Sequence, residues 1–180
     1  IAHEWSFMVP ESTISVWGDT EYTADSVDPD GGTLVTFATT GQTVFQSMVG
    51  KTLKFKTSGN TYTIASITEN TINTTETMSG EVVSDTVTVQ SDGDYLLPAD
   101  HGGFVGNSLS YDEADDSYNG MTISSVARIL ALRQSNVSSS SPASRPFEAA
   151  CKPNSTTNES QHRAVLMVWP VPDGTYTLHY

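Results

Sequence analysis

Cysteine is nearly missing from the sequence, because Cys151 is the only one among 180 residues. One cysteine can form neither an internal disulfide nor a zinc site built from several thiolates. Basic residues are also scarce: 8 Lys and Arg stand against 21 Asp and Glu, which leaves a formal net charge of -13. A surface of this charge repels phosphates, so we expect no sequence-specific binding of nucleic acid. No apolar run approaches the roughly 20 residues that cross a bilayer, so we expect no membrane partner.

Motifs that mark catalytic sites are missing as well. Neither Gly-x-Ser-x-Gly nor His-Glu-x-x-His occurs, and there is no glycine-rich loop of the phosphate-binding kind. The four histidines, His3, His101, His162 and His179, are scattered along the chain. A triad that uses one of them, or a pair of glycosidase carboxylates, stays open without support from the sequence. We therefore expect no enzyme and no cofactor, and we assign no catalytic, cofactor-binding or metal-binding residue.

Carboxylates are abundant, and their densest run is Asp112–Asp116, with four carboxylates in five residues. Such a run could hold a hard cation through oxygen ligands, but the EF-hand spacing of glycine and glutamate is missing. We therefore interpret it as a solvated loop before a helix. Asp28, Asp30, Asp92 and Asp94 lie in glycine-containing segments, and we interpret them as turn residues.

Short runs that alternate apolar and polar residues recur between residues 33 and 89, separated by turn residues such as Gly, Pro, Asn and Asp. These runs are Thr33–Ala38, Thr52–Lys56, Tyr62–Ile67, Asp85–Val89 and a weaker one near Thr71–Asn73. Ser and Thr make up about a quarter of the chain, and β-branched residues favour strands. The pattern predicts a small barrel or sandwich of five antiparallel strands within residues 18–92. Leu53, Phe55, Val87 and Val89 should face its interior, while Lys54 and Lys56 face solvent.

The C-terminal half has a different pattern. Met121–Arg133 spaces its apolar residues at three and four, which predicts the one main helix, capped by Thr122 or Ser124. Phe147–Cys151, Arg163–Trp169 and Thr175–Tyr180 read as strands, and the second is apolar on both faces, so it should be central in a sheet. We expect a mostly β, α+β protein. A discontinuous domain, residues 1–17 and 93–180, would carry the sheet and its helix, with residues 18–92 inserted as the barrel.

Three tryptophans could form an aromatic platform that stacks on sugars. Trp5, Trp17 and Trp169 all lie in apolar contexts, however, so burial in a core is the favoured interpretation. Cys151, placed on a predicted strand, is interpreted as a small buried hydrophobe rather than a nucleophile.

Five segments with recognisable motifs follow one another in the chain. They are Tyr95–Asp100, Leu109–Tyr111, the helix Ile123–Arg133, Ser144–Phe147, and Trp169–Asp173 with Tyr176–Leu178. This ordered set resembles a family of tailed-phage and prophage virion proteins, the neck or head-to-tail adaptor-like proteins. That family reads as Tyr-x-Leu-Pro-x-Asp, a short strand, a helix, Arg-Pro, and a closing Pro-x-Pro-Asp before Tyr-Thr-Leu. The segment His3–Phe7 with Pro10 is similar to the part of the family that follows an N-terminal helical region, which would be lacking here.

The resemblance covers residues 1–17 and 93–180. It implies a structural, non-enzymatic protein of the virion that assembles in a ring below the portal. Its partners would be portal, tail or neck subunits and copies of itself, bound through strand edges and apolar surface. The charge of -13 agrees, because a conduit for DNA should not grip phosphates. The alternative is a carbohydrate-binding β-module of a phage tail or secreted protein that uses exposed tryptophans.

Overall fold

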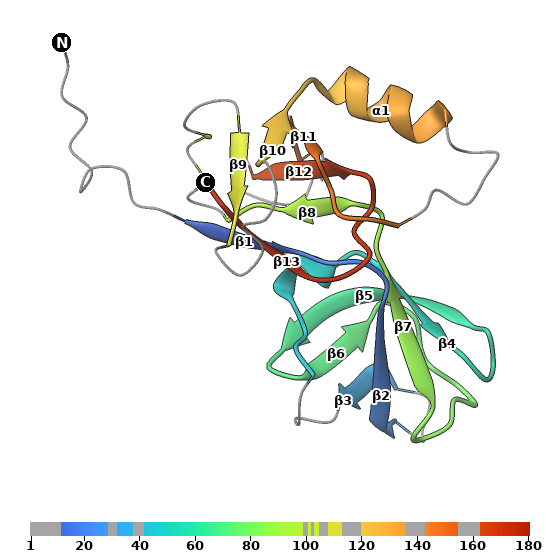
Figure 1. Ribbon diagram of the computed structural model, residues 1–180. Coiled ribbons are helices and arrows are strands. Elements are labelled where there is room, and N and C mark those ends of the chain that lie inside the picture. Colours follow the sequence, from blue (N-terminus) through green and yellow to red (C-terminus); the bar gives the residue numbers. More distant parts are fainter. Residues whose placement is uncertain are drawn as a thin grey trace, which may run out of the picture.

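The computed structural model is mostly β, with one α-helix among the residues that it describes (Figure 1). Those residues are 12–28, 32–37, 42–98, 101, 103–104, 108–112, 120–135, 143–154 and 163–180. The strands are β1 (Thr13–Val16), β2 (Thr20–Val27), β3 (Leu34–Phe37), β4 (Thr52–Phe55), β5 (Thr61–Thr68), β6 (Thr71–Thr74), β7 (Thr86–Gln90), β8 (Asp94–Leu96), β9 (Ser108–Tyr111), β10 (Met121–Ile123), β11 (Glu148–Pro153), β12 (Ala164–Trp169) and β13 (Tyr176–His179). The helices are α1 (Val126–Ser135) and the short 3-10 helix η2 (Gln46–Met48).

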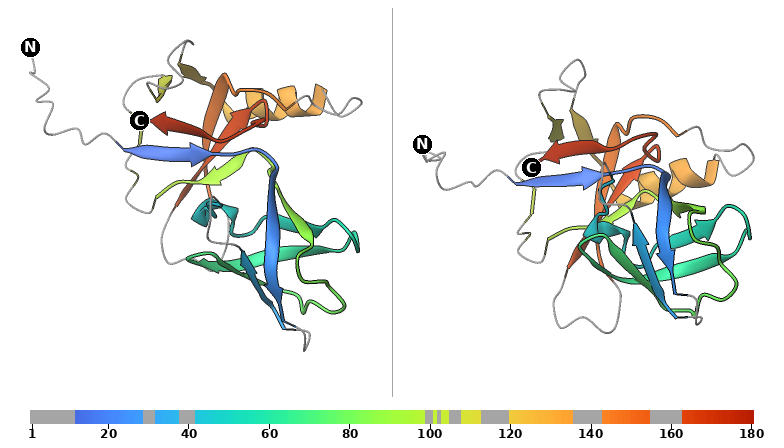
Figure 2. Two further views of the ribbon diagram at one scale, coloured as in Figure 1. Left: turned by 60° about the horizontal axis from the view of Figure 1, so that its bottom comes forward. Right: turned by 90° about the horizontal axis from the view of Figure 1, so that it is seen from below.

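The strands form a closed barrel and a seven-stranded sheet. The barrel order is β2-β3-β6-β5-β4-β7, and the sheet order is β1-β13-β9-β10-β11-β12-β8. All barrel strands therefore fall between β1 and β8 in the chain, as an insertion would. Helix α1 covers one side of the sheet, and the barrel lies on the other side (Figures 1 and 2). The division into two domains remains a prediction, and buried side chains of both parts form one continuous cluster.

The barrel has six strands, one more than expected, because β2 also belongs to it. Strand β2 pairs with β3 on one side and with β7 on the other. Its inward residues are Tyr22, Ala24 and Val27, and the pairing with β3 shifts register between Ala24 and Ser26. This bulge changes the spacing of inward residues from two to three, which hides the strand from a search for strict alternation.

Alternation correctly predicts the faces of the other barrel strands. Leu53, Phe55, Val87 and Val89 are fully buried, whereas Lys54 between the first two is exposed. Register explains this agreement, because β4 pairs with β7 so that Leu53 lies opposite Val89 and Phe55 opposite Val87. The four side chains thus meet on the inside of the barrel.

The sequence pattern predicts a helix that begins at Met121, which is too early in the chain. Its first residues, Met121–Ile123, form β10, which pairs with β9 on one side and β11 on the other. Helix α1 starts only at Val126, and Ser125 caps it, since its hydroxyl accepts a hydrogen bond from the Arg128 amide at 3.2 Å. The prediction of Thr122 or Ser124 as the cap was wrong because β-ladder bonds take up the backbone that would have formed the first helical turn.

Strand β12 lies between β11 and β8, so its predicted central position is confirmed. Leu166 and Val168 join the core on the barrel side, while Met167 and Trp169 pack with Ile129 of α1. A strand covered on both sides needs apolar residues on both sides, which is the pattern that the sequence displays.

Replacing Phe55 with alanine should lower the free energy of unfolding by about 3–5 kcal/mol, measured by urea denaturation. The ring is fully buried and makes an edge contact with Tyr62 at 5.7 Å, so its removal leaves a cavity. The neighbouring Lys54→Ala, which alters only an exposed side chain, should change stability by less than about 0.5 kcal/mol. Equal effects of the two substitutions would contradict the packing described for the barrel.

Candidate functional site

The chain crosses between sheet and barrel twice, at residues 16–20 and 90–94, and Trp17 and Tyr95 fill this junction. Trp17 is fully buried, and its indole N–H donates to the Ser47 hydroxyl at 2.9 Å. The Tyr95 hydroxyl donates to the backbone carbonyl of Trp17, with the Ser91 hydroxyl 2.9 Å away. The two rings meet edge to face at 5.6 Å. Burial raises the pKa of Tyr95, so this phenol remains a neutral donor.

The closing turn Pro170–Gly174 lies directly against the first crossing. The Gly18 amide donates to the Gly174 carbonyl at 3.0 Å, and a Cβ on Gly18 would lie 2.2 Å from the carbonyl oxygen of Pro172. Glycine at position 18 is therefore required by the close approach of two backbones. The crossing is held from both sides, by the sheet and by this turn.

Asp94 organises the charged groups beside the junction. One of its carboxylate oxygens accepts from Arg133 at 2.8 Å, and the other accepts from Lys152 at 2.6 Å. Arg133, at the end of α1, also donates to the backbone carbonyls of Gly93 and Val168. The helix end is thereby attached to β8 and β12. Asp94 is only 16% exposed, so its charge requires these two cations.

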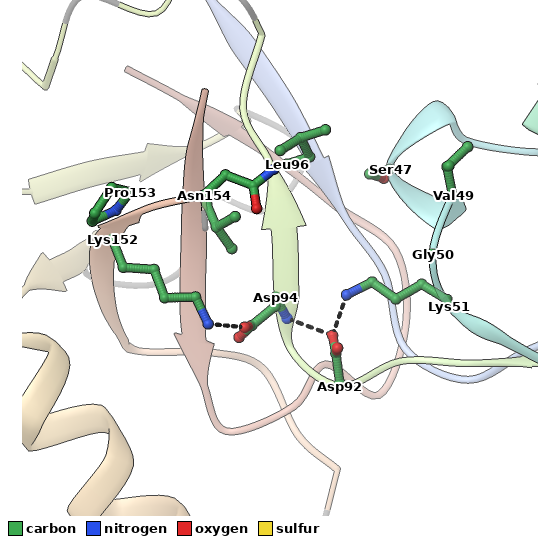
Figure 3. A pocket seen from close by; sticks show the side chains of 11 residues that line it. Ser47, Val49, Gly50, Lys51, Asp92, Asp94, Leu96, Lys152, Pro153 and Asn154 are labelled. Carbon is green, nitrogen blue, oxygen red and sulfur yellow. Dashed lines mark hydrogen bonds and ion pairs between the residues drawn. The ribbon is translucent and has the colours of Figure 1, made fainter. Parts of the chain in front are cut away.

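An open hollow lies between this ion cluster and the barrel (Figure 3). Its volume is about 430 Å³, and an adjoining hollow of about 390 Å³ shares Ser47, Val49 and Leu96 with it. Lys51 pairs with Asp92 on one side, and Lys152 pairs with Asp94 on the other. We call the two spaces together the waist hollow. Its lining consists of Gln46, Ser47, Val49, Gly50, Lys51, Ala65, Ser66, Ile67, Asp92, Asp94, Leu96, Lys152, Pro153, Asn154, Arg163 and Val165.

A second cluster brings together residues that are distant in sequence. The Arg145 guanidinium lies 3.8 Å from the ring centroid of Tyr111 and 5.6 Å from that of Tyr176. The Tyr176 hydroxyl donates to Asp173 at 2.6 Å, and this bond, with burial, raises the pKa of Tyr176 to about 12. The Tyr111 hydroxyl donates to the carbonyl of Pro146. Cation–π and hydrogen-bond contacts thus join three of the five segments that carry the family resemblance.

The predicted turn and loop carboxylates have mixed outcomes. Asp92 does make a turn, because its carboxylate accepts from the Asp94 amide at 2.9 Å. The interpretation of Asp94 as a turn residue is wrong, because its carboxylate binds Arg133 and Lys152. Of the acidic run, the structure describes Asp112 alone, whose carboxylate lies 3.7 Å from His179. Asp30 lies outside the described residues. No three His, Cys, Asp or Glu of the described segments lie close enough together to hold a metal ion.

The remaining candidates can be placed directly. Trp17 and Trp169 are buried, which confirms the core interpretation for both, while Trp5 lies outside the described residues. His3 and His162 also lie outside them. The prediction that Cys151 is buried was wrong: it is exposed on β11, although partial desolvation raises the pKa of its thiol. Strand periodicity gives the side on which a residue lies, but it does not say whether another element covers that side.

The ion cluster has no local signal in the sequence. Arg133 is 39 residues from Asp94 in the chain, and Lys152 is 58 residues away. The only sequence hint is the rarity of cations, since 8 Lys and Arg must serve 21 acids. A cation beside a strand end in such a chain is a candidate partner for a poorly exposed carboxylate.

Comparison with models of protein families, with curated proteins and with solved structures found no match to this chain. Within the part of the chain that the structure describes, no helix has the length and hydrophobicity needed to cross a membrane.

Replacing Tyr95 with phenylalanine should destabilise the protein by about 1–3 kcal/mol, because the buried carbonyl of Trp17 then loses its side-chain donor. Urea denaturation followed by tryptophan fluorescence measures this loss. Tyr176→Phe removes a hydroxyl bound to an exposed carboxylate and should cost less than about 1 kcal/mol. A larger destabilisation by Tyr176→Phe than by Tyr95→Phe would contradict the importance of the junction for stability.

Replacing Asp94 with asparagine should cost about 1.5–3 kcal/mol, because two charge-assisted hydrogen bonds are lost and Arg133 remains without its counter-charge. Asp25→Asn on β2 is the matched control, since Asp25 is an exposed barrel residue. That control should cost under about 1 kcal/mol. Chemical denaturation at neutral pH measures both values, and a larger loss for the Asp25 variant would argue against Asp94 as the organising residue.

Proposed function

We propose that this protein is a structural component of a tailed-phage or prophage virion, in the neck or head-to-tail connector region. It works by protein–protein assembly, and its partners are portal, tail or neck subunits and copies of itself. The observation that carries this proposal is the ordered set of five segments that resembles the virion family. No enzymatic step and no cofactor is part of the proposal.

The contacts of the motif residues support the proposal. Arg145 of the Arg-Pro segment stacks on Tyr111 and Tyr176, and Tyr176 donates to Asp173 of the Pro-x-Pro-Asp segment. Arg133, at the end of the motif helix, binds the strand that contains Tyr95. An accidental set of short sequence matches has no reason to converge on shared contacts. A set retained for one fold does, because each motif then supplies part of the same packing.

Charge also favours a structural role beside DNA. A net charge of -13 on each subunit gives a negative potential that repels phosphates within roughly 10 Å at moderate salt. DNA that passes such a surface makes few contacts that release counterions, so its movement meets little friction.

Immunogold electron microscopy of tailed particles from the source of this gene tests the proposed location. Antibodies raised against the purified protein should label the junction of head and tail, at least tenfold above the label on capsid or tail tip. Particles denatured and probed by immunoblot provide the control for epitopes hidden by assembly. A protein that is undetectable in denatured, purified particles is not a virion component.

A glycan array separates the proposal from the carbohydrate-binding alternative. Trp17 and Trp169 are too deeply buried to stack on a sugar, so among the tryptophans only Trp5 needs to be varied. We expect no retention above that of a protein of equal charge. Specific retention that disappears in Trp5→Ala, with an unchanged melting temperature, would favour the sugar-binding module instead.

A further inference from the structure

Basic groups gather at the waist hollow, although the chain as a whole is acidic. Three of its 8 Lys and Arg, namely Lys51, Lys152 and Arg163, line the hollow. Two carboxylates, Asp92 and Asp94, line it too. Arg133 neutralises Asp94 from the helix side in addition to Lys152. Among the described residues at this place, cations therefore outnumber carboxylates in a molecule whose net charge is -13.

Lysine and arginine side chains supply hydrogen-bond donors to the hollow. Each lysine ammonium has three N–H donors, and Lys51 and Lys152 each use one of them on a carboxylate in the described structure. Between β8 and β12, the Leu97 amide donates to the Ala164 carbonyl, and the Val168 amide donates to the Gly93 carbonyl. Because antiparallel pairing alternates, the Leu96 amide points away from β12. Two of the three lining cations pair with the two carboxylates, so the lining has an excess of one positive charge, which suits it to an anionic oxygen ligand.

We propose that the waist hollow of one copy binds the acidic run Asp112–Asp116 of a second copy. This proposal rests on the assembly role proposed above and names the surface that performs it. The evidence is charge complementarity: the run is the densest group of carboxylates in the sequence, and the hollow is lined by three cations. Carboxylates of the run would bind Lys152 and Arg163, which line the two adjoining parts of the hollow.

The occupant is assigned to a second copy because of where the run begins. Asp112 follows β9 and lies next to His179 of β13, whereas the hollow opens along β8. The sheet order places β10, β11 and β12 between β9 and β8. The hollow and Asp112 lie at different places of the sheet, so the contact is either made twice in a two-fold dimer or repeated from copy to copy in a ring or a filament.

Two electrostatic effects act at different ranges on this contact. The net charges of two copies repel each other over long distances, and salt of about 0.1 M screens that repulsion beyond roughly 10 Å. Ion pairs at contact distance survive this screening and weaken only at higher salt, where the screening length falls to about 3 Å in 1 M. Association should therefore be present in 0.1 M salt and lost in 1 M salt.

Sedimentation velocity of the purified full chain, at rising concentration, measures this association. In about 0.1 M NaCl we expect concentration-dependent oligomers, with an apparent Kd at least tenfold lower than in about 1 M NaCl. Arg163→Glu inverts one charge of the hollow and leaves Arg133 and Lys152, the two cations that pair with Asp94, unchanged. The double variant Asp115→Lys with Asp116→Lys inverts two charges of the run. Each variant alone should remain monomeric. A mixture of the two should associate again, because each hollow then meets a run of opposite charge.

Controls carry the same charge changes elsewhere: Lys54→Glu for the hollow, and Glu21→Lys with Asp25→Lys for the run, all three being exposed barrel residues. Both controls should associate like the original protein. Arg163→Gln, which removes the charge without inverting it, serves as a second hollow variant if Arg163→Glu has a lowered melting temperature. A monomer in all salts, or oligomers that ignore the variants, would overturn this interface. The virion proposal would survive that result, since immunogold labelling tests it independently.

Discussion

The hydrogen bond from the Tyr95 hydroxyl to the Trp17 carbonyl, with the packing of the two rings, is the contact on which this architecture depends. Strands β1 and β8 are the two edges of the seven-stranded sheet. In the chain, β1 is followed by β2 and β8 is preceded by β7, and β2 and β7 pair with each other in the barrel. Opposite edges of one sheet must therefore approach each other where the barrel is attached. Trp17 follows one edge and Tyr95 belongs to the other, so their contact holds the sheet in its curled form. The same contact orients the barrel.

Scarce cations have specific positions in this acidic chain. Arg133 and Lys152 neutralise Asp94, which is only 16% exposed, and thereby join helix α1, β8 and β11. Arg145 has a different partner, the faces of two tyrosine rings. An exposed carboxylate needs no counter-ion because water solvates it, so most of the 21 acids can remain at the surface. Cations are required where burial removes that water, and the described structure places several of them at such positions.

Local patterns predicted much of the fold and little of the candidate site. Alternation placed Leu53, Phe55, Val87 and Val89 inside the barrel, and the two-sided apolar pattern of β12 predicted its central position. Strand β2 was missed because its bulge interrupts the alternation, and the start of α1 was misplaced because β10 has helix-compatible spacing. The waist hollow could not be predicted. It forms between segments that are distant in the chain, and no local spacing encodes their approach.

The described contacts of Tyr95, Arg133 and Arg145 are made within this chain, so they hold its fold together and do not identify a partner. Closure of the barrel leaves it without a strand edge for another chain to pair with. In the sheet, β8 lies against η2, and the two edge strands meet at the junction. The expected assembly through strand edges thus has few backbone groups available to it. Under the proposed assembly role, recognition would use side-chain surfaces, and the waist hollow offers three cations in a chain whose net charge is -13.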